Sequence, residues 1–324
     1  MNLETNYLGL KLRNPVIVSS SGLTDSLDKI KAAAEYGAGA VVMKSIFEEQ
    51  INYQAGILAS GSDYPEAEDY ISYYTQTHSL DNYLKLVESA KKSTDIPVIP
   101  SINCVTADNW INFAKNIESA GADALEINMF FLPLDKTVEP GVAEKLYLNM
   151  VEKLRTILTI PFAIKLGQRF TNLFYTIDQL YNRGANGVVL FNRFFEPDID
   201  INSMNIIPAS VFSKPDDKRN VLRYVAMASA INDRISISAS TGVYSGDDVV
   251  KYLLAGADTV QICSVLYKEG HKYLKELLDF VESWMRSKNY DTVDKFRGLL
   301  NYKNFMDAGK YERAQFMKYF SGYD

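Results

Sequence analysis

Five polar residues stand at the ends of short apolar segments in this chain of 324 residues. They are Lys44, Lys165, Asn103, Asn128 and Asn192. Burying a lysine ammonium without a partner is costly, so these side chains need groups that accept hydrogen bonds. Two lysines and three asparagines in such positions indicate a binding site rather than an apolar core.

Two turns rich in small and polar residues suggest what is bound. Residues 240–246 read Ser-Thr-Gly-Val-Tyr-Ser-Gly, residues 261–264 read Gln-Ile-Cys-Ser, and a helical pattern follows each. Backbone N–H groups at such turns bind phosphate, although ordinary barrel turns can look the same. Together with the lysines they favour a phosphorylated cofactor such as a flavin, whose negative charge on reduction a lysine stabilises. Schiff-base chemistry at Lys44 or Lys165 is the alternative, and the spacing does not separate the two.

These residues are positioned by a repeated unit. Four segments, at 35–44, 120–128, 183–192 and 255–263, contain a Gly-Ala pair followed by a continuously apolar run. Glycine suits the end of a helix, and an apolar run suits a strand buried on both faces of a parallel sheet. Four further strands are expected at 15–19, 97–103, 161–166 and 235–239. Helical patterns fill the intervals at about 25–36, 81–93, 106–119, 141–157, 172–182, 218–230, 245–255 and 266–286.

Strict alternation of eight strands and helices predicts an α/β fold, a (β/α)8 TIM barrel. The alternative is an open doubly wound sheet, which the absence of an early Gly-x-Gly-x-x-Gly motif disfavours. We expect one barrel domain over residues 1–290, with long loops at about 45–80 and 192–217 that serve as lids or substrate loops. Residues 291–324 are expected to form a tail, helical near 309–319, that packs on the barrel or on a partner subunit.

Composition excludes several classes of function. The net charge is −6 and no basic run is present, so we expect no nucleic-acid partner. Two cysteines, Cys104 and Cys263, and two histidines give neither a disulfide framework nor a metal-ligand cluster. The first residues lack the pattern of a signal peptide, and no apolar run is long enough for a membrane span. We therefore expect a cytoplasmic protein that acts on a small molecule.

Seven blocks of sequence, in order, carry a family resemblance. They read Asn-Pro at 14–15, Ser-Ser-Gly at 20–22, Val-Val-Met-Lys-Ser at 41–45, Ala-Leu-Glu-Ile-Asn at 124–128, Ile-Lys-Leu at 164–166, Thr-Gly-Val-Tyr-Ser-Gly at 241–246, and Ala-Gly-Ala-Asp-Thr-Val-Gln-Ile-Cys-Ser-Val-Leu-Tyr-Lys-Glu-Gly at 255–270. The chain thereby resembles the dihydroorotate dehydrogenase family, nearest its class 1 members. The resemblance implies an FMN-binding barrel, an oxidoreductase acting on CH–CH bonds, a link to pyrimidine biosynthesis and, by analogy, a homodimer.

The resemblance also implies roles for individual residues. Lys44 and Lys165 would tune the charge of the flavin, and Asn128 and Asn192 would orient the substrate. The residues implied to contact FMN are Ser20, Ser21, Gly22, Lys44, Ser45, Asn128, Lys165, Phe191, Ser240, Thr241, Gly242, Cys263 and Ser264. The last five of these lie at the phosphate, where Thr241 and Cys263 replace the usual glycines.

The departures from the family lie in the substrate half of the site. Phe131 stands where class 1 enzymes have the cysteine that acts as base, and Arg193 stands where the family has a small residue. The family's orotate-holding segment is missing, and residues 70–83 occupy its region. A glycine-rich segment of the family is replaced by residues 212–220. The flavin half is thus kept and the substrate half is rebuilt, so we expect a substrate other than dihydroorotate.

Few residues remain as acid, base or substrate ligand. His78, in the expected loop at 45–80, is the candidate acid or base, unless it is a solvated loop histidine. Arg193 is the candidate ligand of a substrate carboxylate. Phe130 and Phe131 would form an apolar wall over the pocket. The favoured function is hydride transfer between a small, carboxylate-bearing substrate and FMN; the alternatives are a dihydroorotate dehydrogenase with another base, a flavin-binding protein without turnover and, last, a Schiff-base lyase.

Overall fold

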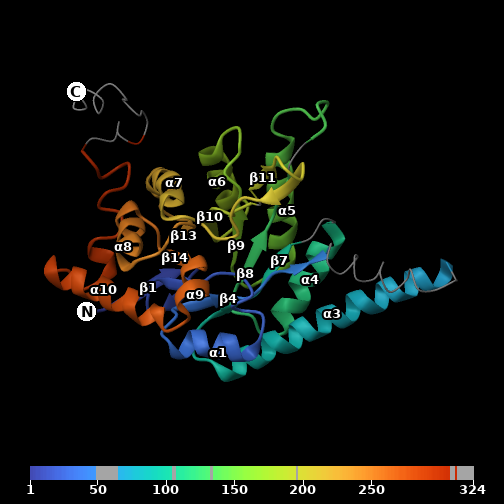
Figure 1. Ribbon diagram of the computed structural model, residues 1–324, viewed down its shortest axis with the longest axis horizontal. Helices are drawn as coiled ribbons and strands as arrows, with labels where there is room; N and C mark the ends of the chain where they lie inside the picture. The colour runs from blue at the N-terminus through green and yellow to red at the C-terminus, as the bar shows by residue number, and fades with distance from the viewer. Residues whose placement is uncertain (49–64, 104–106, 132–133, 195, 307–310, 312–324) are drawn as a thin grey trace.

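A barrel of eight parallel strands forms the centre of the protein, as the alternation of the sequence predicts (Figure 1). The computed structural model describes the backbone of residues 1–48, 65–103, 107–131, 134–194, 196–306 and 311, and all their side chains except those of 65–78 and 107–109. The strands are β3 (Val16–Val18), β4 (Ala40–Val42) continued by β5 (Ile46–Phe47), β6 (Val98–Ile99) continued by β7 (Ser101–Asn103), β8 (Leu125–Asn128), β9 (Phe162–Leu166), β10 (Gly187–Leu190), β13 (Ser236–Ser240) and β14 (Thr259–Ile262).

Strand pairing closes the ring. β14 pairs with β3, β3 with β4, β4 with β6, β5 with β7 and β7 with β8, all in parallel. β6 and β7 are one strand interrupted at Pro100, which has no N–H to donate to a neighbour. The prediction of a closed barrel rather than an open sheet is therefore confirmed.

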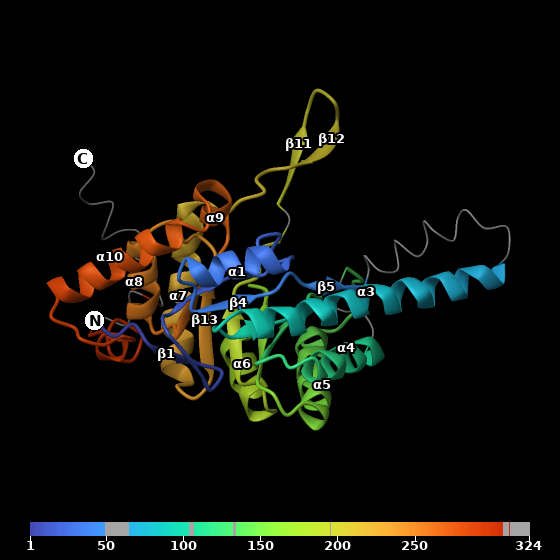
Figure 2. The same ribbon diagram turned by 90° about the horizontal axis from the view of Figure 1, so that it is seen from below.

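Helices surround the strands on the outside (Figures 1 and 2). They are α1 (Leu27–Glu35), α3 (Pro65–Ser93), α4 (Ala107–Ser119), α5 (Val142–Ile157), α6 (Leu173–Asn182), α7 (Lys218–Ile231), α8 (Gly246–Ala255), α9 (Ser264–Glu269) and α10 (Tyr273–Ser287). The single helix expected over 266–286 is in fact two, because Gly270 takes a φ of 77° at the end of α9.

Local sequence explains how α8 is set beside the barrel mouth. The Ser245 side chain accepts from the N–H of Asp248, and the Asp248 carboxylate accepts from the N–H of Ser245, which is a capping box. The helix ends at Gly256, whose φ is 109°. Lys218 at the start of α7 reaches Asp248 with 2.6 Å between Nζ and Oδ1. The turn after β13 is therefore held between two helix starts.

The barrel interior changes from apolar to polar along its axis. At the amino ends of the strands, apolar side chains pack against the hairpin of β1 (Thr5–Tyr7) and β2 (Leu10–Leu12), whose Tyr7 and Leu12 are buried. Above this layer, the inward positions carry Glu126, Lys165 and Gln261. Alternate residues of a strand share a face, so Glu126 and Asn128 point to the same side of β8. The polar groups are thus gathered near the carboxyl ends of the strands.

The two expected loops contain regular structure. Helix α3 begins at Pro65, so the expectation of a loop up to residue 80 is wrong from that point on. The first half of the helix lacks the apolar spacing on which the sequence-based prediction of helices depended. The segment 192–217 contains an antiparallel hairpin, β11 (Pro197–Asp200) and β12 (Asn205–Pro208), that stands out from the barrel (Figure 2), and a short 3-10 helix, η1 (Pro215–Asp217).

Residues after α10 lie against the barrel helices. The ring of Phe296, which follows the 3-10 helix η2 (Val293–Lys295), packs on Trp284 and Tyr290. The N–H of Gly298 donates to the carbonyl of Leu253 at 2.9 Å. This first part of the tail therefore contacts α8 and α10. The helix expected near 309–319 lies, except for Tyr311, outside the described residues.

Asp258, under this tail, makes stability depend on pH. Its carboxylate accepts from the N–H of Ile237 at 2.7 Å and faces Arg297 at 2.8 Å. Burial raises the pKa of Asp258 to about 6, although Arg297 acts to lower it. A carboxyl whose pKa is higher in the folded than in the unfolded state binds protons more tightly when folded, so stability falls as pH rises from about 4 to about 6.

Replacing Asp258 with asparagine should remove this dependence. Between pH 4 and pH 7 the wild type should lose roughly 2 kcal/mol of unfolding free energy relative to Asp258→Asn. Urea denaturation of both proteins across this pH range measures the difference. Parallel curves for the two proteins would show that Asp258 ionises equally easily when folded and unfolded.

Candidate active site

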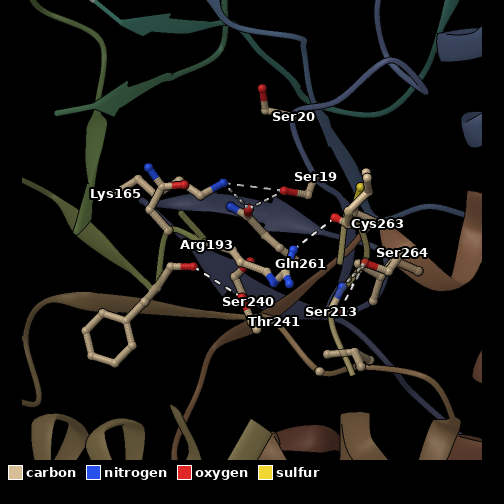
Figure 3. A pocket seen from close by; sticks show the side chains of 16 residues that line it. Ser19, Ser20, Lys165, Arg193, Ser213, Ser240, Thr241, Gln261, Cys263 and Ser264 are labelled. Carbon is tan, nitrogen blue, oxygen red and sulfur yellow. Dashed lines mark hydrogen bonds between the residues drawn. The ribbon is translucent and has the colours of Figure 1, made fainter. Parts of the chain in front are cut away.

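A polar cavity of about 220 Å³ opens at the carboxyl ends of the strands (Figure 3). It is lined by Ser19, Ser20, Lys165, Phe191, Asn192, Arg193, Val211, Ser213, Ser240, Thr241, Gly242, Val243, Gln261, Ile262, Cys263 and Ser264. It adjoins a cavity of about 730 Å³, with which it shares Asn192, Arg193 and Thr241. The fold therefore brings most of the predicted site residues to one place, although they are spread over the whole barrel sequence.

The turns after β13 and β14 form one wall of this cavity. Thr241 and Gly242 have φ values of 91° and 74°, and the Tyr252 hydroxyl donates to the carbonyl of Thr241 at 2.7 Å. Cys263 caps α9, and burial raises the pKa of its thiol, while a hydrogen bond with Ser21 opposes the shift. A neutral thiol and a helix start next to two turns suit a bound phosphate.

A short segment, residues 210–213, closes another side of the cavity. The N–H and hydroxyl of Ser213 both donate to the Ser264 hydroxyl, at 3.1 and 3.0 Å. The guanidinium of Arg193 donates to the carbonyls of Val211 at 2.9 Å and of Ser210 at 3.0 Å. It also pairs with Glu196 at 3.1 Å.

The contacts of Arg193 within the chain compete with its expected role as a carboxylate ligand. Both terminal nitrogens of its fork are used within the chain. Its Nε is buried and has no hydrogen-bond partner among the described residues. The sequence cannot reveal the carbonyls of Ser210 and Val211 as partners, because they come from the far end of the same connection. We therefore interpret Arg193 first as the residue that fixes the 210–213 segment.

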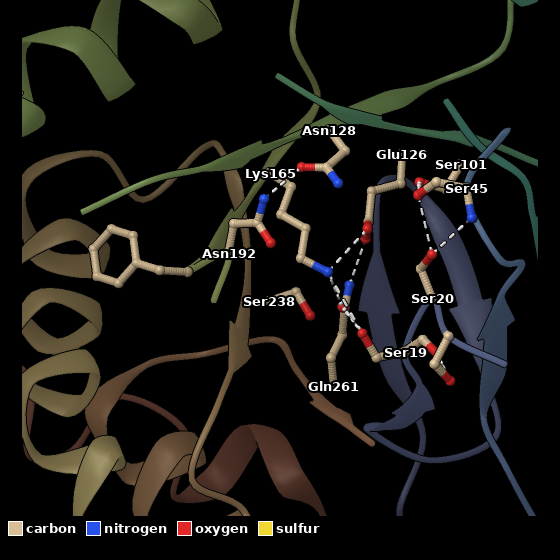
Figure 4. A network of polar contacts seen from close by, with 12 residues as sticks. Ser19, Ser20, Ser45, Ser101, Glu126, Asn128, Lys165, Asn192, Ser238 and Gln261 are labelled. Carbon is tan, nitrogen blue, oxygen red and sulfur yellow. Dashed lines mark hydrogen bonds and ion pairs between the residues drawn. The ribbon is translucent and has the colours of Figure 1, made fainter. Parts of the chain in front are cut away.

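Lys165 lies at the floor of the cavity in a buried network (Figure 4). Its Nζ is 3.3 Å from the Glu126 carboxylate and 3.5 Å from both the Ser19 hydroxyl and the Gln261 side-chain oxygen. The Gln261 amide nitrogen donates to the other oxygen of Glu126 at 2.7 Å. All three distances from Lys165 exceed the roughly 2.7–2.9 Å of a strong charge-assisted hydrogen bond. The ammonium can therefore still donate a shorter bond to a ligand.

Asn128 and Asn192 meet beside the stem of Lys165 (Figure 4). The Asn192 amide nitrogen donates to the Asn128 side-chain oxygen at 2.7 Å, and the Asn192 backbone N–H donates to Leu166 at 2.8 Å. Among the described residues the Asn128 amide nitrogen and the Asn192 side-chain oxygen have no partner, so both are available to a ligand. A donor beside an acceptor suits an amide or an imide, and a carboxylate would use the donor alone.

Lys44 differs from what the sequence suggests. Its side chain is exposed and lines a separate cavity of about 420 Å³ together with Asp25 and Tyr83. The chain leaves the sheet between β4 and β5, where the Lys44 N–H donates to the Thr24 carbonyl at 3.3 Å, so strand alternation no longer aims the side chain inward. The interpretation of Lys44 as a second buried lysine is wrong. Ser45 connects the two cavities, because its hydroxyl contacts that of Ser20 at 3.1 Å.

Comparison with known proteins identifies the family. A sequence profile of the family described as dihydroorotate dehydrogenase matches residues 2–285. The chain belongs to the dihydroorotate dehydrogenase family. This confirms the resemblance inferred from the seven sequence blocks, which span most of the same range.

Individual relatives cover nearly the whole chain at low identity. A dihydroorotate dehydrogenase B (NAD(+)) catalytic subunit from Thermoplasma acidophilum is 25% identical, over 92% of this chain and 98% of its own length. The corresponding subunit from Pyrococcus abyssi is 27% identical, with the same coverage. A chloroplastic dihydropyrimidine dehydrogenase (NADP(+)) from Arabidopsis thaliana is 24% identical, over 92% of this chain and 76% of its own length.

Phe131, which cannot transfer a proton, stands at the position of the class 1 base. Phe131 is exposed, and the ring of the neighbouring Phe130 lies 4.4 Å from that of Phe194, which lines the larger cavity. Neither phenylalanine belongs to the core. Burial raises the pKa of nearby Tyr147 to about 12, and its hydroxyl donates to Met129 at 2.9 Å, so it stays neutral near pH 7. His78 falls in α3 rather than in a loop, and its side chain lies outside the described residues.

Five polar residues of the site were missed by sequence reasoning: Ser19, Tyr83, Glu126, Ser213 and Gln261. Glu126 could have been found, because it shares a strand face with Asn128. Tyr83 could not, because its hydroxyl reaches the backbone of Ser101 from α3, donating at 3.1 Å and accepting at 2.9 Å.

Among the described residues no group of three or more His, Cys, Asp or Glu could hold a metal ion. No described helix is long and apolar enough to span a membrane.

Proposed function

We propose that the chain is an FMN-dependent oxidoreductase that acts on a CH–CH bond of a small organic substrate, with the flavin in the cavity above Lys165. The observation that carries this proposal is the gathering of Lys165, both phosphate-type turns and the paired asparagines around one polar cavity. The relatives named dihydroorotate and dihydropyrimidine dehydrogenases support the same class of reaction.

The residues present fit a flavin with a phosphate. The turns at 241–243 and 263–264 would hold the phosphate through N–H and hydroxyl groups. Lys165, which has only long contacts, would face the ring. A ligand larger than the first cavity can extend into the adjoining one. When bound, FMN supplies a two-electron acceptor for hydride.

The chain's own groups would divide the remaining work. Lys165 stabilises negative charge that develops on the ring, and Asn128 with Asn192 orients the substrate. Arg193 holds the 210–213 segment closed, which keeps water from the cavity. We propose His78 as the acid or base, since Phe131 cannot transfer a proton. The rebuilt substrate half favours a substrate other than dihydroorotate, and a carboxylate on it would accept a hydrogen bond from the Asn128 amide nitrogen.

Schiff-base chemistry has less support from the geometry. The Lys165 Nζ is held in an ion pair with the buried Glu126 carboxylate at 3.3 Å, and an amine held in this way is not free to attack a carbonyl carbon. Borohydride trapping of a carbonyl substrate on Lys165 in a colourless protein would restore that alternative.

Anaerobic titration with dihydroorotate tests the proposed function. The protein is purified without added cofactor, and its visible spectrum is recorded before and after dihydroorotate and then dithionite. We expect a yellow protein that dithionite bleaches and dihydroorotate does not. Bleaching by stoichiometric dihydroorotate would mean that another base replaces the missing cysteine. A colourless protein that takes up no added FMN would refute the flavin site, and a yellow protein that no candidate substrate reduces would favour binding without turnover.

We also propose that the hairpin of β11 and β12 forms part of a homodimer interface. Ile199 and Ile206 are cross-strand partners on one face of the hairpin and are 66% and 72% exposed. Pro197 pairs with Pro208 on the same face. A twofold axis brings the same patch of each subunit together, and a patch without charge meets its copy without repulsion.

Introducing a charge on this face should dissociate the dimer. Ile206→Asp is expected to weaken self-association at least about tenfold, because the new carboxylate would be buried opposite its copy. Asn205→Asp adds the same charge on the opposite face and serves as the control. Light scattering after gel filtration, over a range of concentrations, measures both. A wild type that stays monomeric, or equal dissociation of both variants, would contradict this interface.

A further inference from the structure

A buried charged pair in the barrel lies beneath the proposed flavin. Glu126 is 1% exposed and Lys165 is 7% exposed, so water screens the two charges only weakly. Figure 4 shows the two side chains pointing toward each other from the adjacent strands β8 and β9. A buried ion pair is weak evidence for stability, because the loss of hydration offsets the attraction. Stability alone therefore does not explain why a carboxylate is buried at Glu126.

Gln261 fixes the carboxylate in place from the other side of the barrel. Its amide nitrogen donates to Glu126 at 2.7 Å, and its oxygen accepts from the Ser19 hydroxyl at 3.0 Å. The same oxygen lies 3.5 Å from the Lys165 Nζ. Because both ends of the amide are engaged, Glu126 cannot turn away from Lys165 without breaking a short hydrogen bond. The opposing charge is held at a constant distance from the ammonium.

The field that reaches a ligand above Lys165 is thus the sum of a positive and a negative charge. A lone ammonium would strongly favour the negative charge of a reduced flavin. A carboxylate 3.3 Å behind it removes part of that effect. In an interior of low dielectric constant, this compensation is much larger than it would be in water.

We propose that Glu126 is a positioning residue that lowers the effective positive charge of Lys165, and that Glu126 and Gln261 together set the reduction potential of the bound flavin. The inference rests on the proposed function, since it requires FMN above Lys165. It assigns a role to a residue that touches neither cofactor nor substrate.

The test compares substitutions at Glu126 that remove or withdraw its charge. Glu126→Gln removes the negative charge beside Lys165 with little change in shape, and Glu126→Asp keeps the charge but withdraws it by one methylene group. The midpoint potential of bound FMN is measured for both and for the wild type by equilibration with a reference dye. We expect a more positive potential for Glu126→Gln, corresponding to about a tenfold change in the equilibrium constant for reduction, and a smaller shift in the same direction for Glu126→Asp. Ser19→Ala, which breaks a hydrogen bond of the same network without changing charge, should shift the potential less.

The outcomes separate this inference from the proposed function. A wild type that binds no FMN overturns both. A wild type that binds FMN, with a Glu126→Gln potential that is unchanged, more negative or shifted no further than that of Ser19→Ala, overturns the inference alone. If Glu126→Gln does not fold, Glu126→Asp decides by itself, since an unchanged or more negative potential would be the wrong sign.

Discussion

Replacing Lys165 with methionine is expected to slow substrate-driven flavin reduction by about 10²–10³-fold, the effect of removing one preorganised charge from a site where charge develops. Lys165 is the buried cation that lines the main cavity. Because its contacts are 3.3–3.5 Å long, its ammonium can still donate a shorter hydrogen bond to a negatively charged ligand. Stopped-flow reduction of the FMN-loaded protein measures the rate, once a substrate that reduces the wild type has been found.

The same substitution should also destabilise the protein. It leaves the Glu126 carboxylate buried without its partner, which costs roughly 3–5 kcal/mol. The double substitution Lys165→Met and Glu126→Gln removes both charges and should recover most of the lost stability, but none of the lost rate. Urea denaturation of the two variants separates the effects. Recovery of the rate in the double variant would show that Lys165 acts only as a structural partner of Glu126.

Replacing Gly242 with alanine is expected to weaken FMN binding by at least about tenfold and to destabilise the fold by more than 2 kcal/mol. Gly242 has a φ of 74°, and an added Cβ would lie 2.4 Å from the backbone nitrogen of Lys218. Backbone at the start of α7 cannot move aside as a flexible side chain can. The turn after β13 would have to shift, and the groups assigned to the phosphate would shift with it.

Gly270 provides a matched control for this prediction. Its φ is 77°, close to that of Gly242, but an added Cβ would meet no atom within 4 Å. Gly270→Ala should therefore show the backbone cost alone, roughly 1–3 kcal/mol because the ψ of Gly270 is 170°, and leave FMN binding unchanged. Fluorescence titration with FMN and thermal denaturation measure both variants. Equal effects in the two proteins would mean that the close packing at Gly242 contributes nothing to the cofactor site.

Much of the fold follows from the sequence because its signals are local. Continuous apolar runs such as 187–190, each preceded by a Gly-Ala pair or a turn, predict buried parallel strands wherever they occur. The departure at 65–80 has the same origin, since a helix without a clear apolar face gives no periodic signal. The hairpin of β11 and β12 was missed because its apolar residues face away from the barrel.

The sequence by itself determined the barrel, the two turns suited to phosphate and the departure at Phe131, because each depends on residues close together in the chain. Only the tertiary structure decided that Lys44 is exposed, that Arg193 is used by its own loop, and that Glu126 and Gln261 surround Lys165. Strand alternation tells which face a side chain is on, but not which side chain it meets. That partner depends on how the eight strands are staggered when the ring closes, and this is a property of the whole barrel.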